Sequence, residues 1–382
     1  MTSVRDRILT ALFLIVLFLP ALMTGASHEE AHGRLEEKRQ LAKRPGFPEK
    51  VDAVIAFPRQ FEAYFNDHFQ LREVLIRSHN RLKIKLLKKS PQKDVLLGRD
   101  GWFFYTRNNL LQDFLGLEPL SAEALHDRQR LLEAKRDWLA SQGIPYLFVV
   151  APNKQTIYPE KMPEGYIRSK DPSRLDQLLD YLRSHSDIPV VDLRKSLLAD
   201  KAKEKLYFST DTHWTPSGAF IGYQRIMEAL HRRLNDPRLT PRSFTDYRSI
   251  ASVREDGDLA GMLGIEGDIK ESYDRLEPLF TPCSQAEPLP NYLNFDWKPF
   301  PDPVAINCPS ADLRLVMFHD SFGKGLRPYL SEHFKRSVYI WYNNVDGDRF
   351  RAAILKEKPD IVIEEIVERM ISYMQCGPEY KP

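Results

Sequence analysis

The chain has 382 residues, of which 42% are hydrophobic and 28% are charged. This composition is that of a globular protein, and the length allows one large α/β domain or two smaller ones. The 55 basic and 53 acidic side chains are intermixed and leave a formal net charge of +2, so no basic field indicates a nucleic-acid partner. No dinucleotide fingerprint and no phosphate loop occurs in the sequence, so we expect no nucleotide or other cofactor.

The first predicted element is an export segment. Residues 8–26 are nearly all apolar up to Met23 and follow Arg5 and Arg7. Such a run fits the hydrophobic region of a secretory signal, and its last three residues are small enough for a cleavage site. Left uncleaved, it would anchor the chain in a membrane with its arginines in the cytoplasm. Residues 1–26 are therefore predicted to be a signal peptide or a signal anchor, and the rest to be exported.

Residues 27–92 are predicted to form a polar linker and then a helical arm. From Arg59 onwards, apolar side chains recur at spacings of three, four and seven residues, which is a helical pattern. The other side of this pattern is basic. The plain interpretation is a solvated face, and the alternative is a surface that docks on an anionic membrane or an acidic polymer. The basic residues concerned are Arg77, Arg81, Lys85 and Lys88.

Residues 93–382 have the pattern of an α/β domain. A hairpin is predicted over 95–105 because Asp100 and Gly101 favour a tight turn. A helix is predicted over 121–142, where Gly143 suits its C-terminal end. Alternation of strands with helices is typical of a mostly parallel sheet covered on both faces. The predicted strands of this sheet lie at 144–150, 189–193, 337–342 and 360–366.

Between residues 235 and 311 the alternation stops and prolines become frequent. We interpret this stretch as an irregular insertion beside the active site that shapes a groove for the acceptor. Two of the three cysteines, Cys283 and Cys308, lie in it and are the best pair for a disulfide in an exported protein. Cys376 would then be a lone thiol.

The first chemical motif is the serine turn that follows a predicted strand over 313–318. Residues 319–323, His-Asp-Ser-Phe-Gly, turn sharply at the end of that strand. An α/β enzyme can place a nucleophile such as Ser321 there, with the backbone N–H groups that follow facing an oxyanion. The alternative is that Ser321 is an ordinary turn or cap residue and that His319 only shapes the turn.

The second motif is Asp211 and His213, just before a predicted helix start. Thr215 fits the N-cap, and Pro216 fits the first helical position because its missing N–H costs nothing there. A carboxylate two residues from an imidazole can accept a hydrogen bond from its protonated nitrogen and thereby set its tautomer. The alternatives are a capping aspartate beside a buried histidine, or two ligands of a metal, although no third ligand is evident and no metal is expected.

Taken together, these motifs resemble the SGNH-hydrolase-like alginate O-acetyltransferase family of the AlgJ/AlgX type. The resemblance implies an SGNH-like α/β fold and a triad of Ser321, His213 and Asp211, in an order reversed from ordinary SGNH esterases. It also implies that acetyl groups arrive from an MBOAT-type membrane acyltransferase and pass to a polysaccharide. The implied location is the periplasm, with residues 8–26 as an inner-membrane anchor unless they are cleaved. The segments that carry it are GRDGWFFY (98–105), APNKQTIYPEKMP (151–163), TDTHWTPSGAF (210–220), HDSFG (319–323) and KPDIVIEEIVERM (358–370).

The predicted function is an exported polysaccharide O-acetyltransferase that works through an acetyl-serine intermediate. Two alternatives are an acetyl esterase with the same triad, and a non-catalytic carbohydrate-binding or assembly subunit. Candidate donors for the oxyanion, besides the N–H of Ser321, are the side chains of Asn153, Asn343 and Arg369. Candidate residues for stacking on sugar rings are Trp102, Trp214, Trp341 and Tyr329.

Overall fold

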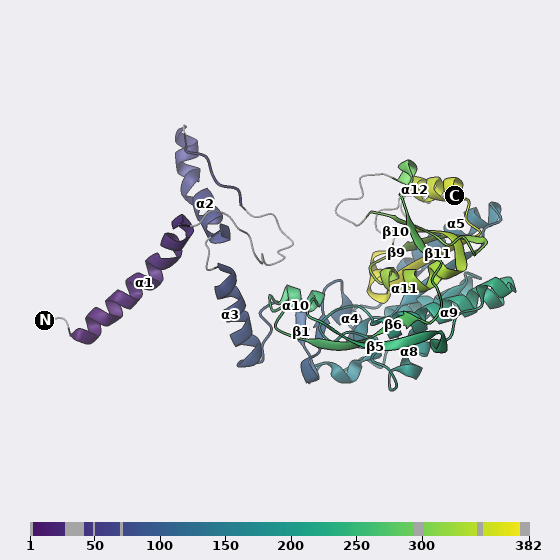
Figure 1. Ribbon diagram of the computed structural model, residues 1–382, viewed down its shortest axis with the longest axis horizontal. Helices are drawn as coiled ribbons and strands as arrows, with labels where there is room; N and C mark the ends of the chain where they lie inside the picture. Colours follow the sequence, from purple (N-terminus) through teal and green to yellow (C-terminus); the bar gives the residue numbers. More distant parts are fainter. Residues whose placement is uncertain are drawn as a thin grey trace. The chain divides into compact units, whose positions relative to one another are not determined.

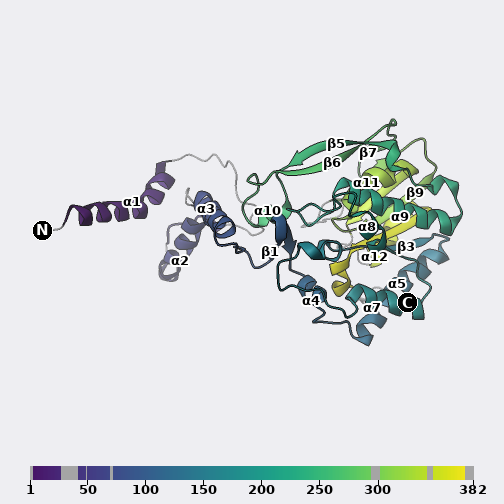
Figure 2. The same ribbon diagram turned by 90° about the horizontal axis from the view of Figure 1, so that it is seen from below.

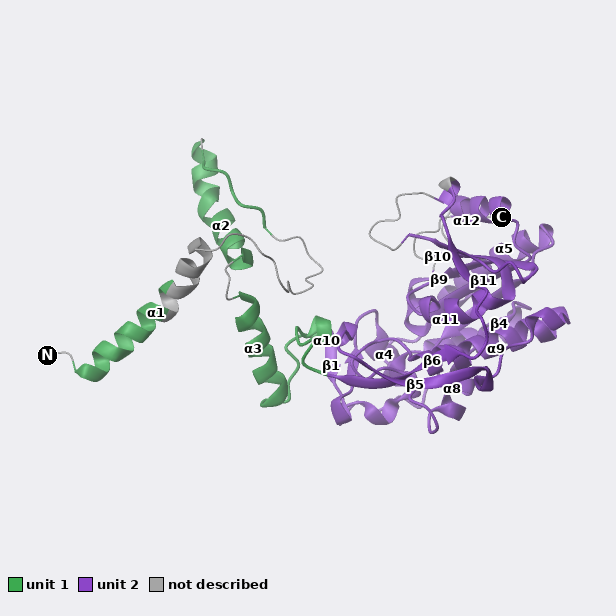
Figure 3. Cartoon of the chain, viewed as in Figure 1, with its two compact units in different colours: residues 1–93, 260–269 green, residues 94–259, 270–382 purple. Residues whose placement is uncertain are grey.

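The structure is a computed structural model that describes residues 3–26, 42–48, 50–68, 72–293, 302–341 and 347–374. Figure 1 and Figure 2 show its helices and strands. The chain divides into two compact units (Figure 3). The first comprises residues 1–93 and 260–269, and the second comprises residues 94–259 and 270–382.

The first unit is helical, as the spacing of apolar residues predicts. Within the described ranges, no helix combines the length and the apolar character needed to cross a membrane. The helices are α1 (Val4–Ala26), α2 (Val51–His68) and α3 (Arg72–Lys85). The last three residues of α10 (Asp258–Met262) also belong to this unit.

The predicted solvated basic face of α3 is in part wrong. Arg77 lies 2.5 Å from the carboxylate of Glu266, and Arg81 donates to both oxygens of Asp268 at 2.5 and 2.6 Å. These acids lie in residues 260–269, nearly two hundred positions after the arginines that they bind. Local spacing therefore could not reveal them. Two of the four basic residues are thus already paired.

The second unit is built on a seven-stranded sheet with the order β4-β3-β11-β9-β10-β8-β7. The first five strands in this order run parallel to one another, as predicted. At the other edge, β8 pairs antiparallel with β10, and β7 pairs antiparallel with β8. The sheet is therefore mixed. Its strands are β3 (Tyr146–Ala151), β4 (Val190–Asp192), β7 (Gln285–Glu287), β8 (Val304–Asn307), β9 (Leu313–His319), β10 (Phe334–Trp341) and β11 (Ile361–Val367).

Helices cover both faces of this sheet, which confirms the prediction. Successive strand residues alternate between two hydrophobic cores, for example Phe148 in one and Val149 in the other. One core is completed by α8 (Arg194–Asp200), α9 (Pro216–Leu234) and α11 (Gly323–Leu330). The other is completed by α5 (Ala122–Ser141), α7 (Arg174–His185) and α12 (Gly347–Glu357).

Short elements connect these layers. The predicted hairpin is present as β1 (Val95–Leu97) and β2 (Phe103–Tyr105), and Asp100 and Gly101 at its turn have φ of 54° and 77°. The remaining short helices are α4 (Leu110–Phe114), α6 (Lys154–Ile157), η1 (Arg99–Gly101), η2 (Pro159–Lys161), η3 (Pro237–Leu239), η4 (Phe244–Asp246), η5 (Asn291–Leu293), η6 (Ser331–His333) and η8 (Glu368–Tyr373).

The stretch 235–311 is more regular than predicted. It contains an antiparallel hairpin of β5 (Tyr247–Arg254) and β6 (Glu271–Pro278), and it supplies β7 and β8 to the main sheet. The prediction of an irregular insertion is wrong because the hairpin strands are largely polar and no residue of β5 is fully buried. A strand of that kind has no apolar run to reveal it.

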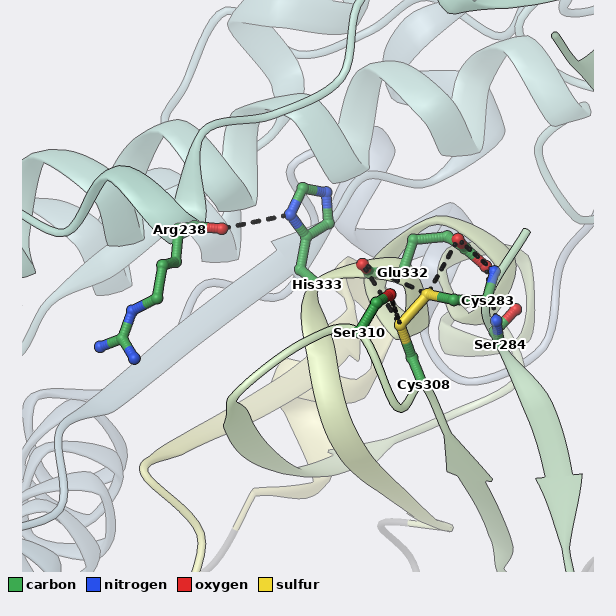
Figure 4. Close-up of a disulfide and its surroundings, with 7 residues drawn as sticks. All are labelled: Arg238, Cys283, Ser284, Cys308, Ser310, Glu332 and His333. Atoms are coloured by element: carbon green, nitrogen blue, oxygen red, sulfur yellow. Dashed lines mark hydrogen bonds between the residues drawn. A yellow bond between two sulfur atoms is a disulfide. The ribbon is translucent and has the colours of Figure 1, made fainter. Parts of the chain in front are cut away.

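The predicted disulfide is present. Cys283 and Cys308 are bonded, and Figure 4 shows them beside Glu332. The carboxylate of Glu332 accepts hydrogen bonds from the N–H groups of Cys283 and Ser284 at 3.0 and 3.1 Å. The disulfide thus joins the segment just before β7 to the residue just after β8, and the hydrogen bonds of Glu332 tie the same segment to η6. Cys376 lies outside the described residues.

Candidate active site

Polar residues gather where three parallel strands end. Ala151 of β3 pairs with Val367 of β11, and β11 in turn pairs with β9. The carboxyl ends of parallel strands form the usual site edge of an α/β sheet. The residues that follow these ends are Asn153 and Lys154, Glu368 and Arg369, and Asp320 and Ser321. Asn343, which follows β10, lies outside the described residues.

Asp211 and His213 lie on a loop, residues 207–215, that leads into α9. The hydroxyl of Thr215 accepts from the N–H of Gly218, and Pro216 is the first helical residue. The predicted cap is therefore confirmed. Tyr207 and Trp214 form an isolated bridge that closes the loop on itself. We name residues 207–215 the catalytic loop.

Asp211 and His213 form the expected hydrogen-bonded pair. Nδ1 of His213 lies 2.7 Å from Oδ1 of Asp211, and the N–H of His213 donates to the same oxygen at 2.8 Å. The other oxygen accepts from Arg254 at 3.0 Å and from the N–H of Asp258 at 3.1 Å. Burial opposes ionisation of Asp211, but the bonds from His213 and the charge of Arg254 outweigh it and lower the pKa of Asp211. A carboxylate in this place makes Nδ1 the protonated nitrogen and leaves Nε2 as a base.

The nitrogen that would act as base has no partner. Nε2 of His213 is buried and has no hydrogen bond among the described residues, so the hydroxyl of Ser321 is not bonded to it. The imidazole lies 5.1 Å from the ring of Phe322, centroid to centroid. The serine turn and the catalytic loop therefore meet through Phe322, the residue after Ser321. Ser321 itself is half-buried. Catalytic hydrogen bonds are often long or absent until substrate is bound.

Lys154 holds the catalytic loop from one side. Its ammonium donates to the carbonyl oxygens of Phe208, Ser209 and Asp211 at 3.1, 3.1 and 2.7 Å. Three N–H groups thus meet three acceptors, a match that only the charged form makes. Burial lowers the pKa of Lys154 to about 7, while nearby carboxylates, Asp258 foremost, oppose this effect.

Glu271 of β6 holds the same loop from the other side. Its carboxylate accepts from the N–H and hydroxyl groups of both Ser209 and Thr210, and pairs with Lys205 at 2.7 Å. Burial would raise the pKa of Glu271, but these hydrogen bonds lower it to about 2. Neither Glu271 nor Arg254 was identified from sequence, because both belong to the hairpin that lacked any apolar signal.

The serine turn is fixed by Asp320. Its carboxylate accepts from the N–H of Phe322 at 2.9 Å and from the N–H of Val367 at 2.7 Å. The turn is thereby tied to the end of β11, next to Arg369. Burial raises the pKa of Asp320, and the charge of Arg369 opposes that shift.

His319 is a structural residue of the turn. Nε2 of His319 lies 3.1 Å from a guanidinium nitrogen of Arg327, and Nδ1 lies 2.5 Å from the carbonyl oxygen of Asp320. Arginine only donates, so Nε2 is the acceptor and Nδ1–H donates to the carbonyl. Burial, reinforced by Arg327, lowers the pKa of His319 to about 3. A Cβ on Gly323 would lie 2.5 Å from the His319 ring, so this position needs glycine.

Two of the predicted oxyanion donors lie together. Oδ1 of Asn153 accepts from Arg369 at 3.5 Å, which leaves the amide N–H groups of Asn153 available. The guanidinium of Arg369 lies 5.6 Å from the ring of Phe322. The backbone N–H of Asn153 donates to Glu368, and burial raises the pKa of Glu368 to about 7. Both candidates are therefore close to the serine turn.

The predicted stacking residues have different surroundings. Trp214 and Tyr329 line a cavity next to the catalytic loop. Trp102 is buried against Tyr158, and Trp341, at the end of β10, lies 5.4 Å from the ammonium of Lys324. Buried aromatic residues of this kind contribute mainly to the core.

A third potential metal ligand is present, contrary to the sequence-based expectation. Asp258 joins Asp211 and His213, with one ligand atom of each within 4.8 Å of the others. The two oxygens of Asp258 already accept from the N–H and hydroxyl of Thr212 at 2.7 and 2.6 Å. Because Arg254 and the protein's own donors occupy these carboxylates, the donor set fits a hydrogen-bonded network rather than a cation site.

The fold, together with the hydrogen-bonded pair of Asp211 and His213, defines an SGNH-hydrolase-like domain. Residues 95–287, about half of the chain, match the family model described as "SGNH hydrolase-like domain, acetyltransferase AlgX", and the chain belongs to this family. The predicted family is thereby confirmed.

Among similar proteins are those named probable alginate O-acetylase AlgJ. The protein of Pseudomonas putida is 27% identical over 212 residues, covering 54% of this chain and 51% of its own length. That of Pseudomonas syringae pv. tomato is 28% identical over 265 residues, covering 68% and 59%. The chain thus spans somewhat more than half the length of these relatives. The solved structure of Bacillus cereus PatB1 shares the fold, with a TM-score of 0.52 at 16% identity, over 75% of this chain and 98% of that one.

Proposed function

We propose that this protein is an exported polysaccharide O-acetyltransferase with Ser321 as nucleophile, His213 as base and Asp211 as its orienting carboxylate. The observation that carries the proposal is the 2.7 Å bond from His213 to Asp211, which leaves an unpartnered Nε2 on a loop packed against Phe322. Family membership supports the class of reaction.

In the first half-reaction, Oγ of Ser321 attacks the carbonyl carbon of the acetyl donor while Nε2 of His213 takes the hydroxyl proton. The tetrahedral intermediate collapses, the leaving group departs with that proton, and an acetyl ester remains on Ser321. In the second half-reaction, His213 takes the proton of a sugar hydroxyl as its oxygen attacks the ester. Ser321 then leaves and regains the proton.

Charge on the tetrahedral oxygen needs fixed donors. The N–H of Ser321 is one, and the free amide of Asn153, held by Arg369 and Glu368, is another. Arg369 adds a positive charge beside the turn. Asn343 remains a candidate outside the described residues.

The source of acetyl groups and the location of the protein belong to the same proposal. We infer an MBOAT-type membrane acyltransferase as donor partner, a polysaccharide acceptor and no nucleic-acid partner. Residues 8–26 would direct export to the periplasm and act there as an anchor, unless they are cleaved. The names of the AlgJ relatives support an acetylated polysaccharide as product.

The test is acetyl transfer from p-nitrophenyl acetate by the purified full chain. Wild type should release nitrophenol in a burst and carry acetyl on Ser321 in a mass spectrum, and Ser321→Ala should lower transfer by at least about a thousandfold. Ser249→Ala, an exposed serine on β5, is the matched control. Equal transfer by Ser321→Ala would refute the proposal.

The same assay separates the alternative functions. In an esterase, added oligosaccharide would leave the rate of acetyl-enzyme breakdown unchanged, whereas a transferase would be accelerated by it. A folded wild-type protein that is never acetylated would indicate a non-catalytic binding subunit.

A further inference from the structure

Two adjoining cavities lie between the β5–β6 hairpin and the helices α9 and α11. Their volumes are about 640 and 340 Å³. They share Pro216, Pro328 and Tyr329 and therefore lie side by side around these residues. We name the two cavities together the hairpin groove.

The hairpin groove begins at the residues that hold the catalytic pair. The larger cavity is lined by Trp214 and Arg254. Trp214 directly follows His213, and Arg254 donates to Asp211 at 3.0 Å. From there the groove continues to Pro282 and Glu332, beside the disulfide. A polymer lying in it would reach the catalytic loop at one end.

The lining suits a sugar. The rings of Tyr273, Tyr247 and Phe280 are half-buried and contribute to the walls, and aromatic faces bind the C–H faces of sugar rings. Burial raises the pKa of Tyr247 to about 12, so its hydroxyl stays neutral and can donate.

Trp214 forms part of the wall of the larger cavity. It is 4% exposed, and its Nε1–H has no acceptor among the described residues. Gly325 also lines the larger cavity, and a Cβ there would lie 2.5 Å from that nitrogen. A side chain at position 325 would therefore displace the indole. Glycine at this position lets Trp214 form the wall of the cavity directly beside His213.

The charges of the hairpin groove do not suit a polyanion. The two cations among its described lining residues are both paired: Arg254 with Asp211 and Asp256, and Arg275 with Glu277 at 3.6 Å. The acids Glu255, Asp256 and Glu332 line it as well. Recognition of a uronate polymer needs cations that are free to meet its carboxylates.

We propose that the hairpin groove binds the acceptor polysaccharide as a run of neutral sugar residues and leads it to the catalytic loop. This inference rests on the proposed acetyltransferase function, because that function makes the bound sugar an acceptor. Binding itself can be measured without catalysis.

The first test is binding of cellopentaose, a neutral probe, to the full-length Ser321→Ala protein by titration calorimetry. Val253 lines the larger cavity and is 60% exposed, so Val253→Trp should fill the groove and weaken binding by about tenfold or more. Ser249→Trp, on the same strand but not among the lining residues, should bind normally. No binding by the parent protein, or equal binding by Val253→Trp, would overturn the inference.

The second test separates the groove from the chemistry. For Val253→Trp with an intact Ser321, the rate of acetyl transfer to cellopentaose is divided by the same protein's rate of acetyl-enzyme formation from p-nitrophenyl acetate. This ratio should fall about tenfold relative to wild type. If wild type forms no acetyl-enzyme, the proposed function fails and the binding result still decides the groove. A mannuronate pentamer that binds as well as cellopentaose or better at low salt would refute the preference for neutral sugars.

Discussion

Two side chains of opposite charge organise the catalytic loop. Residues 207–215 belong to no long strand or helix, so their backbone groups need other partners. Lys154 satisfies carbonyl oxygens and Glu271 satisfies N–H groups of the same few residues. Each is buried, and each lies far along the chain from the pair it supports. The position of His213 thus depends on two residues that hold the backbone of the loop around it.

Replacing Lys154 by Met should separate positioning from binding. Methionine keeps the buried stem but leaves three carbonyl oxygens without donors, so the loop should shift and kcat should fall by about tenfold to a hundredfold. The KM for p-nitrophenyl acetate should change little, because the three N–H groups of Lys154 already donate to carbonyl oxygens of the loop. Burst kinetics at several pH values would measure both constants.

The matched control for that change is Lys195→Met, an exposed lysine of α8. Circular dichroism must show that both variants are folded. An unchanged kcat in folded Lys154→Met would contradict the positioning role.

At the scale of elements, the join between β9 and α11 is the most constrained part of the site. His319 ends the strand, Asp320 caps the turn, and Gly323 begins the helix against the His319 ring. Close packing of this kind leaves no room for an added methyl group. The exposure of Ser321 therefore depends on a glycine two residues later.

Gly323→Ala should accordingly destabilise the protein by about 1–3 kcal/mol through overpacking against His319. Thermal unfolding and the rate of acetyl-enzyme formation should both decline. Gly261→Ala, in α10, where an added Cβ meets nothing within 4 Å, should be neutral or slightly stabilising. A Gly323→Ala protein as stable as wild type would show that the turn has more room than the structure indicates.

At the scale of the whole molecule, stability in acid should depend on Glu271. Its folded pKa of about 2 lies below the usual 4.5. A lowered carboxyl pKa contributes stability above pH 4.5, amounting here to about 3 kcal/mol, and this contribution is lost as pH falls through about 2. Glu271→Gln should therefore be less stable than wild type at pH 7, and the difference should shrink towards pH 2.

Urea unfolding at several pH values would measure that difference. Asp274→Asn, an exposed acid on the same strand, serves as control and should track wild type. A constant difference between Glu271→Gln and wild type across this range would show that the effect comes from lost packing rather than ionisation.

The sequence alone determined much of the framework, because its signals are local. The N-cap Thr215 with Pro216, the apolar run of β9 and the two-residue spacing of Asp211 and His213 each act within one or two turns of chain. Hydrophobic runs likewise predicted the parallel part of the sheet. Mixed pairing at its edge was missed since β7 and β8 are only three and four residues long.

Only the tertiary structure decided which distant side chains complete the site. Arg254 lies 43 positions from Asp211, and Glu271 lies 61 positions from Thr210. Contacts of this range depend on strand order and loop paths, which propensity and periodicity do not encode. The hairpin groove is likewise formed by elements that meet only after folding. Local chemistry therefore identified the residues proposed to react, and long-range packing decided how they are held and what can approach them.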